Sequence, residues 1–364
     1  MHQPSSTAIA PKARLAASDW VRVAPFIALH LACLSVLAVG ISWVAVGVTL
    51  VTFFARVFGL TAFYHRYFSH RAFKTSRWFQ FVGAFLGGAA GQRGPLWWAA
   101  HHRDHHRHSD TDGDVHSPHV HGFWWSHMGW FMRHDNFNKG LAGVKDFTRF
   151  PELVWIDRYD YVAPLVLGVG MYGLGAWLNA SYPSLHTSGM QLLIWGFLVS
   201  TVALYHTTYA INSLAHTHGT RRFPTKDESR NNLWLALLTF GEGWHNNHHY
   251  YPSAARQGFY WWEVDVTYYL LRCCASLGLV WDLREVPQQV LAEGRALDAG
   301  QPVTGRPSAS SPLASARGGG RGPARRAQES HAASDRRGVA RGATQSGESE
   351  EASPDLPLPR EGHA

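Results

Sequence analysis

Histidine offers most of the chemistry in this chain, with 23 histidines among 364 residues. Nine of them fall in four short clusters: His65 and His70 in HRYFSH; His102, His105 and His106 in HRDHH; His216 in NSLAH; and His245, His248 and His249 in HNNHH. Imidazole is a good ligand for iron, zinc and copper ions. Nine neutral ligands are too many for one ion, so the clusters predict a site for two metal ions.

The spacing within the clusters indicates how the rings are held. In H-x-x-H-H, successive helical residues are about 100° apart, so all three rings can point at one spot beside a helix. The pair His65 and His70 is too widely spaced for a single α-helical face and fits a helix end, where the chain turns back. Asn212 lies one turn before His216 and could hold a metal-bound water.

Two zinc ions in a hydrolase would explain such a cage equally well from the ligands alone. The chain, however, carries long apolar segments and has no serine or cysteine nucleophile motif. Its three cysteines, Cys33, Cys273 and Cys274, have no metal-binding spacing. We therefore expect a redox pair of iron ions.

The elements that position the clusters are predicted membrane helices, because crossing a bilayer takes roughly 20 mostly apolar residues in a helix. Four segments qualify, at about 23–39, 41–60, 161–178 and 190–211. The connections inside each pair lack Lys and Arg, whereas the polar segments on the other side are basic. The positive-inside rule then places both termini and the metal site in the cytoplasm, as in a bacterial inner membrane.

Two details of this topology are further expectations. Arg56, near the end of the second segment, is expected to extend its side chain to the lipid headgroups. Residues 78–92 are apolar but short and rich in glycine, so we predict an interfacial or re-entrant segment rather than a fifth span.

The domain plan has three parts. Residues 1–22 form a cytosolic N-terminal segment without the apolar region of a signal peptide, and residues 23–298 hold the membrane helices and the clusters. Residues 299–364 are rich in Gly, Pro, Ser, Ala and Arg and predict a disordered tail. The net charge of +7 is spread over the tail and loops, which fits a membrane face better than nucleic-acid binding.

Five motifs in order resemble the membrane fatty acyl desaturases, specifically the acyl-CoA Δ9 branch in a bacterial form. They are TAFYHRYFSHR, WWAAHHRDHHRHSDTDGDVHSP, GFWWSHMGW, INSLAH and GEGWHNNHHYYP, and the resemblance covers roughly residues 25–285. It implies an all-α integral membrane protein with four transmembrane helices and a cytosolic helical cap. In that family the nine histidines listed above, and a water on Asn212, hold two irons.

The resemblance also implies a substrate site and partners. The positions that shape a bend in the family's acyl tunnel match Gln92, Trp98 and Thr208, and its closed end falls near Phe53 and Val57. The implied reaction places a cis double bond, expected at Δ9, in a saturated acyl chain, with O2 reduced to water. No acid or base side chain is needed, and electrons come from a separate protein such as a ferredoxin, a cytochrome b5-like protein or a reductase.

The substrate carrier and the outcome of the reaction have alternatives. Acyl-CoA is the expected carrier, but Ala100 and His101 stand where the animal acyl-CoA enzymes have an Arg-Asp pair, so phospholipid-bound chains are the alternative. A related di-iron hydroxylase or ketolase would use a similar cage. A metal transporter is disfavoured, since few ionisable residues lie within the spans.

The remaining histidines are expected to play lesser parts. His30, His186, His206 and His331 are read as surface or core residues. His101, His108, His116, His119, His121 and His218 are expected to lie in loops or behind the metal ligands.

Overall fold

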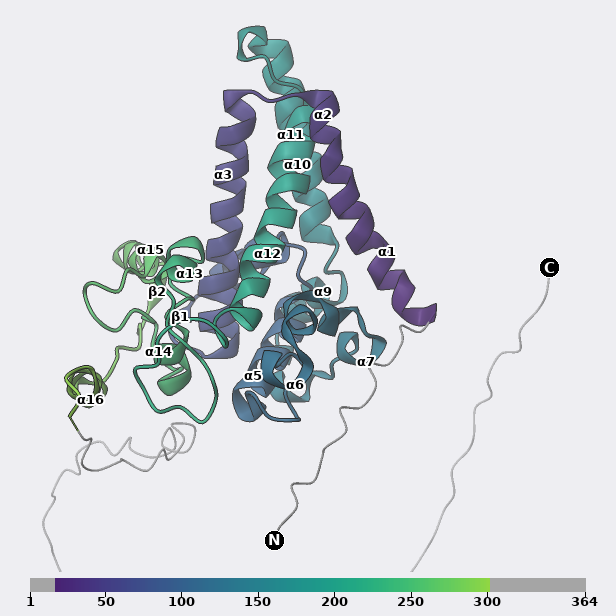
Figure 1. The fold of residues 1–364 in the computed structure, drawn as a ribbon. Helices are drawn as coiled ribbons and strands as arrows, with labels where there is room; N and C mark the ends of the chain where they lie inside the picture. The colour runs from purple at the N-terminus through teal and green to yellow at the C-terminus, as the bar shows by residue number, and fades with distance from the viewer. Residues whose placement is uncertain (1–16, 302–364) are drawn as a thin grey trace, which may run out of the picture. The chain divides into compact units, whose positions relative to one another are not determined.

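The computed structural model describes residues 17–301, which are mostly helical. Four helical segments are long and apolar enough to cross a membrane: Asp19–Val39, Trp43–Ser69, Val162–Ser181 and Gly189–Ser213. They coincide with the four predicted spans, although the second continues nine residues beyond its predicted end at residue 60. In Figure 1 these long helices run side by side, and the shorter helices gather around one of their ends.

The membrane segments are built from several consecutive elements. The first contains α1 (Ala17–Ala32), η1 (Cys33–Ser35) and α2 (Val36–Val39), and the second contains α3 (Trp43–Phe58) and the π-helix η2 (Gly59–Ser69). The third is α10 (Val162–Ser181). The fourth contains α11 (Gly189–Leu192), the π-helix η7 (Leu193–Val199) and α12 (Ser200–Ser213).

The turn between the first two segments is set by local chemistry. Gly40 ends α2 with φ of 65°, a left-handed conformation that glycine adopts without steric cost. Ser42 then begins α3, and its side chain accepts a hydrogen bond from the backbone N–H of Ala45. Ser188 begins α11 in the same way. Each pair of membrane helices is therefore joined by a short, capped connection.

Arg56 does not reach the membrane surface as the sequence predicted. Its side chain is 1% exposed, and it donates hydrogen bonds to the carbonyls of Thr52 and Ala89 and to the hydroxyls of Ser200 and Thr201. The expectation was wrong because α12 supplies hydroxyl acceptors inside the bundle. The guanidinium therefore joins α3 to α12 within the apolar part of the protein.

Residues 78–92 do not form a fifth span. They lie mostly in α4 (Arg77–Gly88), which packs against η2. The glycines allow this close approach: a Cβ added at Gly83 would lie 1.9 Å from the ring of Phe63, and one added at Gly87 would lie 2.4 Å from the ring of Tyr64. The interfacial or re-entrant placement itself remains a prediction.

The remaining helices form a cap. Between α4 and α10 they are α5 (Pro95–His108), α6 (Pro118–His121), η3 (Trp125–Gly129), η4 (Trp130–Met132), α7 (His134–Phe137), η5 (Leu141–Val144), α8 (Lys145–Thr148) and α9 (Pro151–Arg158). After α12 they are α13 (Leu233–Leu238), α14 (His245–Tyr250), α15 (Val266–Ser276) and α16 (Gln288–Asp298). The short 3-10 helix η6 (Pro183–Leu185) joins α10 to α11.

One small departure from an all-helical fold is an antiparallel pair of two-residue strands, β1 (Lys74–Thr75) and β2 (Val280–Trp281). The pair ties the chain after the second span to the segment that follows α15. Of the predicted N-terminal segment and tail, residues 1–16 and 302–364 lie outside the described residues. His331 lies there as well.

Candidate metal centre

The H-x4-H pair is positioned by a π-helix at the end of the second span. The backbone N–H of His70 donates to the carbonyl of His65 five residues earlier, at 3.3 Å, which is the π-helical bond. This wider turn places the residue five positions later nearly above the first. The ring centroids of His65 and His70 are consequently 4.9 Å apart, although an α-helix would direct them to different sides.

The nine predicted histidines converge in two adjacent groups. Within each group the ligand nitrogens lie within 4.8 Å of one another. The five-histidine group contains His65, His70, His102, His106 and His248, and the four-histidine group contains His105, His216, His245 and His249. The structure therefore brings together all nine residues that the sequence singled out.

Each H-x-x-H-H motif is divided between the two groups, which differs from the single spot expected beside each helix. On α5, His102 and His106 join the five-histidine group, while His105 joins the other. On α14 the division is reversed, since His245 and His249 join the four-histidine group. Residues i and i+4 share a face, and the remaining ring points to the neighbouring group.

The ring nitrogens face each other at short distances. The Nε2 atoms of His65 and His248 are 3.0 Å apart, those of His70 and His102 are 2.8 Å apart, and those of His216 and His245 are 3.0 Å apart. Several of these rings are fixed from behind through Nδ1, so their Nε2 lone pairs point into the groups. Such an arrangement suits a cation between the rings.

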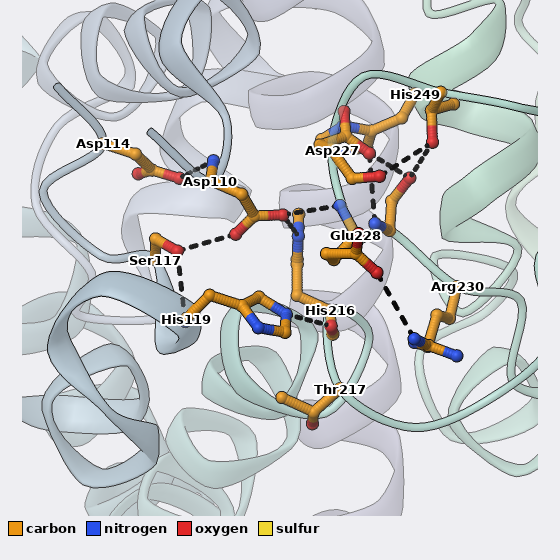
Figure 2. Close-up of polar contacts among 12 residues, drawn as sticks. Asp110, Asp114, Ser117, His119, His216, Thr217, Asp227, Glu228, Arg230 and His249 are labelled. Atoms are coloured by element: carbon orange, nitrogen blue, oxygen red, sulfur yellow. Dashed lines mark hydrogen bonds and ion pairs between the residues drawn. The ribbon is translucent and has the colours of Figure 1, made fainter. Parts of the chain in front are cut away.

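Buried carboxylates hold the rings from behind, and the sequence reading missed their role. Nδ1 of His105 lies 2.9 Å from Asp114, that of His216 lies 2.8 Å from Asp110, and that of His249 lies 2.8 Å from Asp227. Figure 2 shows Asp110 and Asp227 beside His216 and His249. Such contacts fix the tautomer so that Nε2 is the ligand atom.

In the five-histidine group one carboxylate plays this part. Glu242 contacts Nδ1 of His65 and also pairs with Arg66 at 3.0 Å. The amide of Gln257 lies 3.2 Å from Nδ1 of His65 and 3.5 Å from that of His248. Closeness to a histidine cluster in the sequence could have indicated Asp110, Asp114 and Glu242, whereas Asp227 is far from every cluster in the sequence.

The surroundings keep most of the ligand nitrogens unprotonated. Burial lowers the pKa of His102, His106 and His248 well below the usual value, and the neighbouring imidazoles lower it further. Burial also disfavours protonation of His105, but the charge of Asp114 outweighs it and raises that pKa. Metal ligation needs neutral imidazole, so these three residues of the five-histidine group are available to bind a cation near neutral pH.

The donor set fits a pair of transition-metal ions. Nε2 of His249 is buried without a hydrogen-bond partner among the described residues, while its Nδ1 is held by Asp227. A bound ion would satisfy this nitrogen. All-imidazole ligation suits iron, copper or zinc and is unsuited to magnesium or calcium.

A third set of potential ligands, His105, Asp114 and His116, overlaps the four-histidine group. Asp114 hydrogen-bonds to Nδ1 of His105 and also lies 3.4 Å from Nδ1 of His116. Burial and the neighbouring His105 lower the pKa of His116 to about 3. Asp114 is therefore shared between His105 and His116.

A cavity of about 630 Å³ reaches both histidine groups. Its walls include His65 and His102 from one group, His105 and His245 from the other, and Asn212. The remaining lining is largely apolar and aromatic, and includes Phe26, Leu60, Trp97, Phe131, Phe197 and Tyr205. An extended apolar molecule in this space would therefore lie against both groups.

The predicted substrate residues divide between cavity wall and core. Gln92, Trp98 and Thr208 line the cavity; the amide of Gln92 donates to the hydroxyl of Thr208 at 2.6 Å, and Trp98 stacks on His102. Phe53 and Val57 are buried in the core and are not among the lining residues. The roles predicted for all five remain predictions.

Two histidines read as isolated residues are connected. Nε2 of His30 lies 3.1 Å from Nε2 of His206, and Nδ1 of His206 lies 3.0 Å from Nε2 of His127. This row joins α1, α12 and η3. His186 lies in the connection after η6 with φ of 48°.

The histidines expected in loops or behind the ligands mostly bond to the backbone. His119 donates to the carbonyl of His216, His121 to that of Asp114, and His101 to that of Asn136. His108 and His218 are exposed. His119 and His121 therefore support the residues that carry or hold the ligands.

Comparisons with known proteins agree with this geometry. The fatty acid desaturase family model matches residues 41–281. The chain is 36% identical over 269 residues to an sn-1 stearoyl-lipid 9-desaturase of Anabaena variabilis, covering 73% of this chain and 94% of that protein.

Two plant relatives differ, by name, in the carrier of the acyl chain and in the position that is desaturated. A palmitoyl-monogalactosyldiacylglycerol delta-7 desaturase of Arabidopsis thaliana is 36% identical, with 74% of this chain and 69% of that protein covered. An acyl-CoA 5-desaturase of Anemone leveillei is 35% identical, with 72% and 78% covered. From the match of its helices, its histidine clusters and its sequence, the chain belongs to the fatty acid desaturase family.

Proposed function

We propose that this protein introduces a cis double bond, at position 9, into a saturated fatty acyl chain, using two iron ions and O2. The observation that carries the proposal is the apolar cavity whose wall includes histidines of both groups and Asn212. An acyl chain in that cavity would present its methylenes to both ion positions.

The overall reaction removes two hydrogens from adjacent methylenes and reduces O2 to two waters, with two electrons and two protons supplied from outside. The irons would supply the oxidising power that breaks unactivated C–H bonds. The sequence shows no cytochrome b5-like haem motif, no GxGxxG nucleotide motif and no cysteines spaced for an iron–sulfur cluster, so we propose a separate protein, such as a ferredoxin, a cytochrome b5-like protein or a reductase, as the electron donor.

The residues of the protein must bind and align an acyl chain that has no polar group along its length. Apolar side chains exclude water from the cavity, and positioning at a fixed depth selects one C–C bond. The Gln92–Thr208 hydrogen bond and the ring of Trp98 give the wall a fixed shape beside His102. We propose that this wall bends the chain and so favours the cis product.

A lipid-bound acyl chain is the proposed substrate in place of the acyl-CoA expected from the sequence. The Anabaena and Arabidopsis relatives act on lipids by name, whereas the Anemone relative acts on acyl-CoA. Ala100 and His101, which replace a charged pair of the animal acyl-CoA enzymes, are buried. The cavity wall also includes the exposed Val21 and Tyr161 at the ends of two membrane segments, where a lipid could enter.

The side of the membrane is part of the proposal. We propose that both termini and the metal centre face the cytoplasm of a bacterial inner membrane, because the connections inside each helix pair lack Lys and Arg. Electron carriers are then available on the same side.

Expression in a bacterial host that lacks unsaturated fatty acids tests the reaction. Restored growth, with a cis-Δ9 monounsaturated product located by mass spectrometry, is expected. A hydroxylated product, or no modified fatty acid, would contradict the proposal. Supplying purified protein and donor with saturated phospholipid vesicles or with acyl-CoA then tests the carrier, and turnover confined to acyl-CoA would contradict the lipid assignment.

A further inference from the structure

The two histidine groups differ in the charges that surround them. Three carboxylates stand behind the four-histidine group, those of Asp110, Asp114 and Asp227. Asp114 is 1% exposed, Asp227 is 9% exposed, and the side chain of Asp110 is 6% exposed. Each contacts Nδ1 of a different ligand histidine, as Figure 2 shows for Asp110 and Asp227.

These three charges are not neutralised by cationic side chains. Between residues 17 and 301, no lysine or arginine forms an ion pair with Asp110, Asp114 or Asp227. Their other partners are neutral donors: the Ser117 hydroxyl and backbone N–H groups for Asp110 and Asp114, and Ser229 for Asp227. The nearby Arg230 pairs with Glu228.

The charge around the five-histidine group is largely balanced. Glu242 is the carboxylate that touches one of its ligands, and the buried Arg66 pairs with Glu242 and with Asp265 at 3.0 Å each. A second guanidinium, that of Arg103, bonds the carbonyls of Phe68 and Ser69 beside His70, and pairs with Asp146. The charged side chains around the five-histidine group, namely Glu242, Asp265, Asp146, Arg66 and Arg103, together carry a charge of about −1. The three carboxylates behind the four-histidine group carry −3.

A carboxylate behind a ligating imidazole makes that ligand more basic, and a nearby negative charge stabilises the more highly charged ion. We propose that the iron held by the four-histidine group has a lower reduction potential than the iron held by the five-histidine group. This inference rests on the iron centre proposed above. A single electron from a one-electron reductant then converts the Fe(III)Fe(III) centre to Fe(II)Fe(III), with Fe(II) in the five-histidine group. The two sites are therefore reduced in a fixed order.

Asp227→Asn and Glu242→Gln form a matched pair of variants, because each removes one carboxylate charge from behind one group. The purified, iron-loaded full chain is reduced stepwise with dithionite and mediators, while EPR spectroscopy follows the mixed-valence signal. In Asp227→Asn the reduction potential of the second electron rises more than that of the first. The mixed-valence state therefore exists over a narrower range of applied potential than in the unaltered protein. In Glu242→Gln the reduction potential of the first electron rises more than that of the second. The mixed-valence state therefore exists over a wider range of applied potential.

We expect the stability constant of the mixed-valence state to change by about tenfold in each variant. An effect of this order is expected when one buried charge near an ion is lost. A range of potential that narrows in both variants, or widens in both, would overturn the assignment. A range that widens in Asp227→Asn and narrows in Glu242→Gln would overturn it as well. Where Asp227→Asn holds fewer than two irons, Asp110→Asn replaces it with the same expectation, and both proteins are loaded with excess iron because loss of either contact weakens metal binding.

Iron content and product formation by the unaltered chain are measured in the same preparations. A chain that binds no iron overturns both this assignment and the proposed function. Two irons and a desaturated product, with the wrong response of the variants, overturn only the assignment.

Discussion

Nδ1 of His216, just beyond the end of a membrane helix, lies 2.8 Å from a carboxylate oxygen of Asp110, 106 residues earlier in the chain. The same oxygen accepts a hydrogen bond from the backbone N–H of Glu228 at 2.8 Å. Asp110 therefore joins three distant segments behind one ligand. The placement of the His216 ring therefore depends on residues from distant parts of the chain as well as on its own helix.

Replacing Asp110 with Asn is expected to weaken metal binding at the four-histidine group. Loss of a contact behind a ligand typically costs about 10- to 100-fold in metal affinity or activity. Metal content after dialysis against graded chelator measures the change. Asp112→Asn is the matched control, because Asp112 is exposed in the same loop and its replacement should leave metal content unaltered.

Replacing His248 with Ala removes one ligand from the five-histidine group. Activity is expected to fall by more than about 100-fold, beyond the usual effect of changing a residue behind a ligand. Metal analysis should give close to one ion per chain in place of two. His108→Ala is the control on α5, where His108 is exposed, and full turnover by the His248 variant would refute its role.

Thr208 offers a test of the cavity wall. Its hydroxyl accepts from Gln92 and donates to the carbonyl of Leu204, so Thr208→Val frees the Gln92 side chain while keeping the volume similar. We expect products with a less uniform double-bond position or geometry, measured by gas chromatography and mass spectrometry. Thr207→Val, which removes the neighbouring hydroxyl bonded to Ala203, should give the unaltered product pattern.

His101 predicts a pH dependence of stability. Burial, with the nearby charge of Lys139, lowers its pKa to about 4, whereas an unfolded chain has the ordinary value near 6.5. The unfolded state binds more protons between these values, so the folded state loses stability as pH falls from about 6.5 to 4. This one group accounts for about 3 kcal/mol.

The His101→Gln variant keeps a donor for the carbonyl of Asn136 and cannot be protonated in this range. Thermal unfolding of metal-free protein between pH 7 and 4 should show a smaller decline in the variant. Equal declines in both proteins would show that His101 titrates normally.

The membrane helices and the convergence of the nine histidines could be predicted from sequence because apolar length and H-x-x-H-H spacing are local signals. The division of each motif between two groups could not, since it depends on how α5 faces α14. Arg56 was misplaced for a similar reason: the hydroxyls of Ser200 and Thr201 that receive it lie 144 and 145 residues away. Asp227 meets His249 only through the folded loop after α12.

The most direct test of the account is an anomalous-scattering map of the iron-loaded protein recorded at the iron absorption edge. Two peaks are predicted, one among the Nε2 atoms of the five-histidine group and one among those of the four-histidine group, both beside the apolar cavity. A single peak, or peaks away from these histidines, would contradict the account.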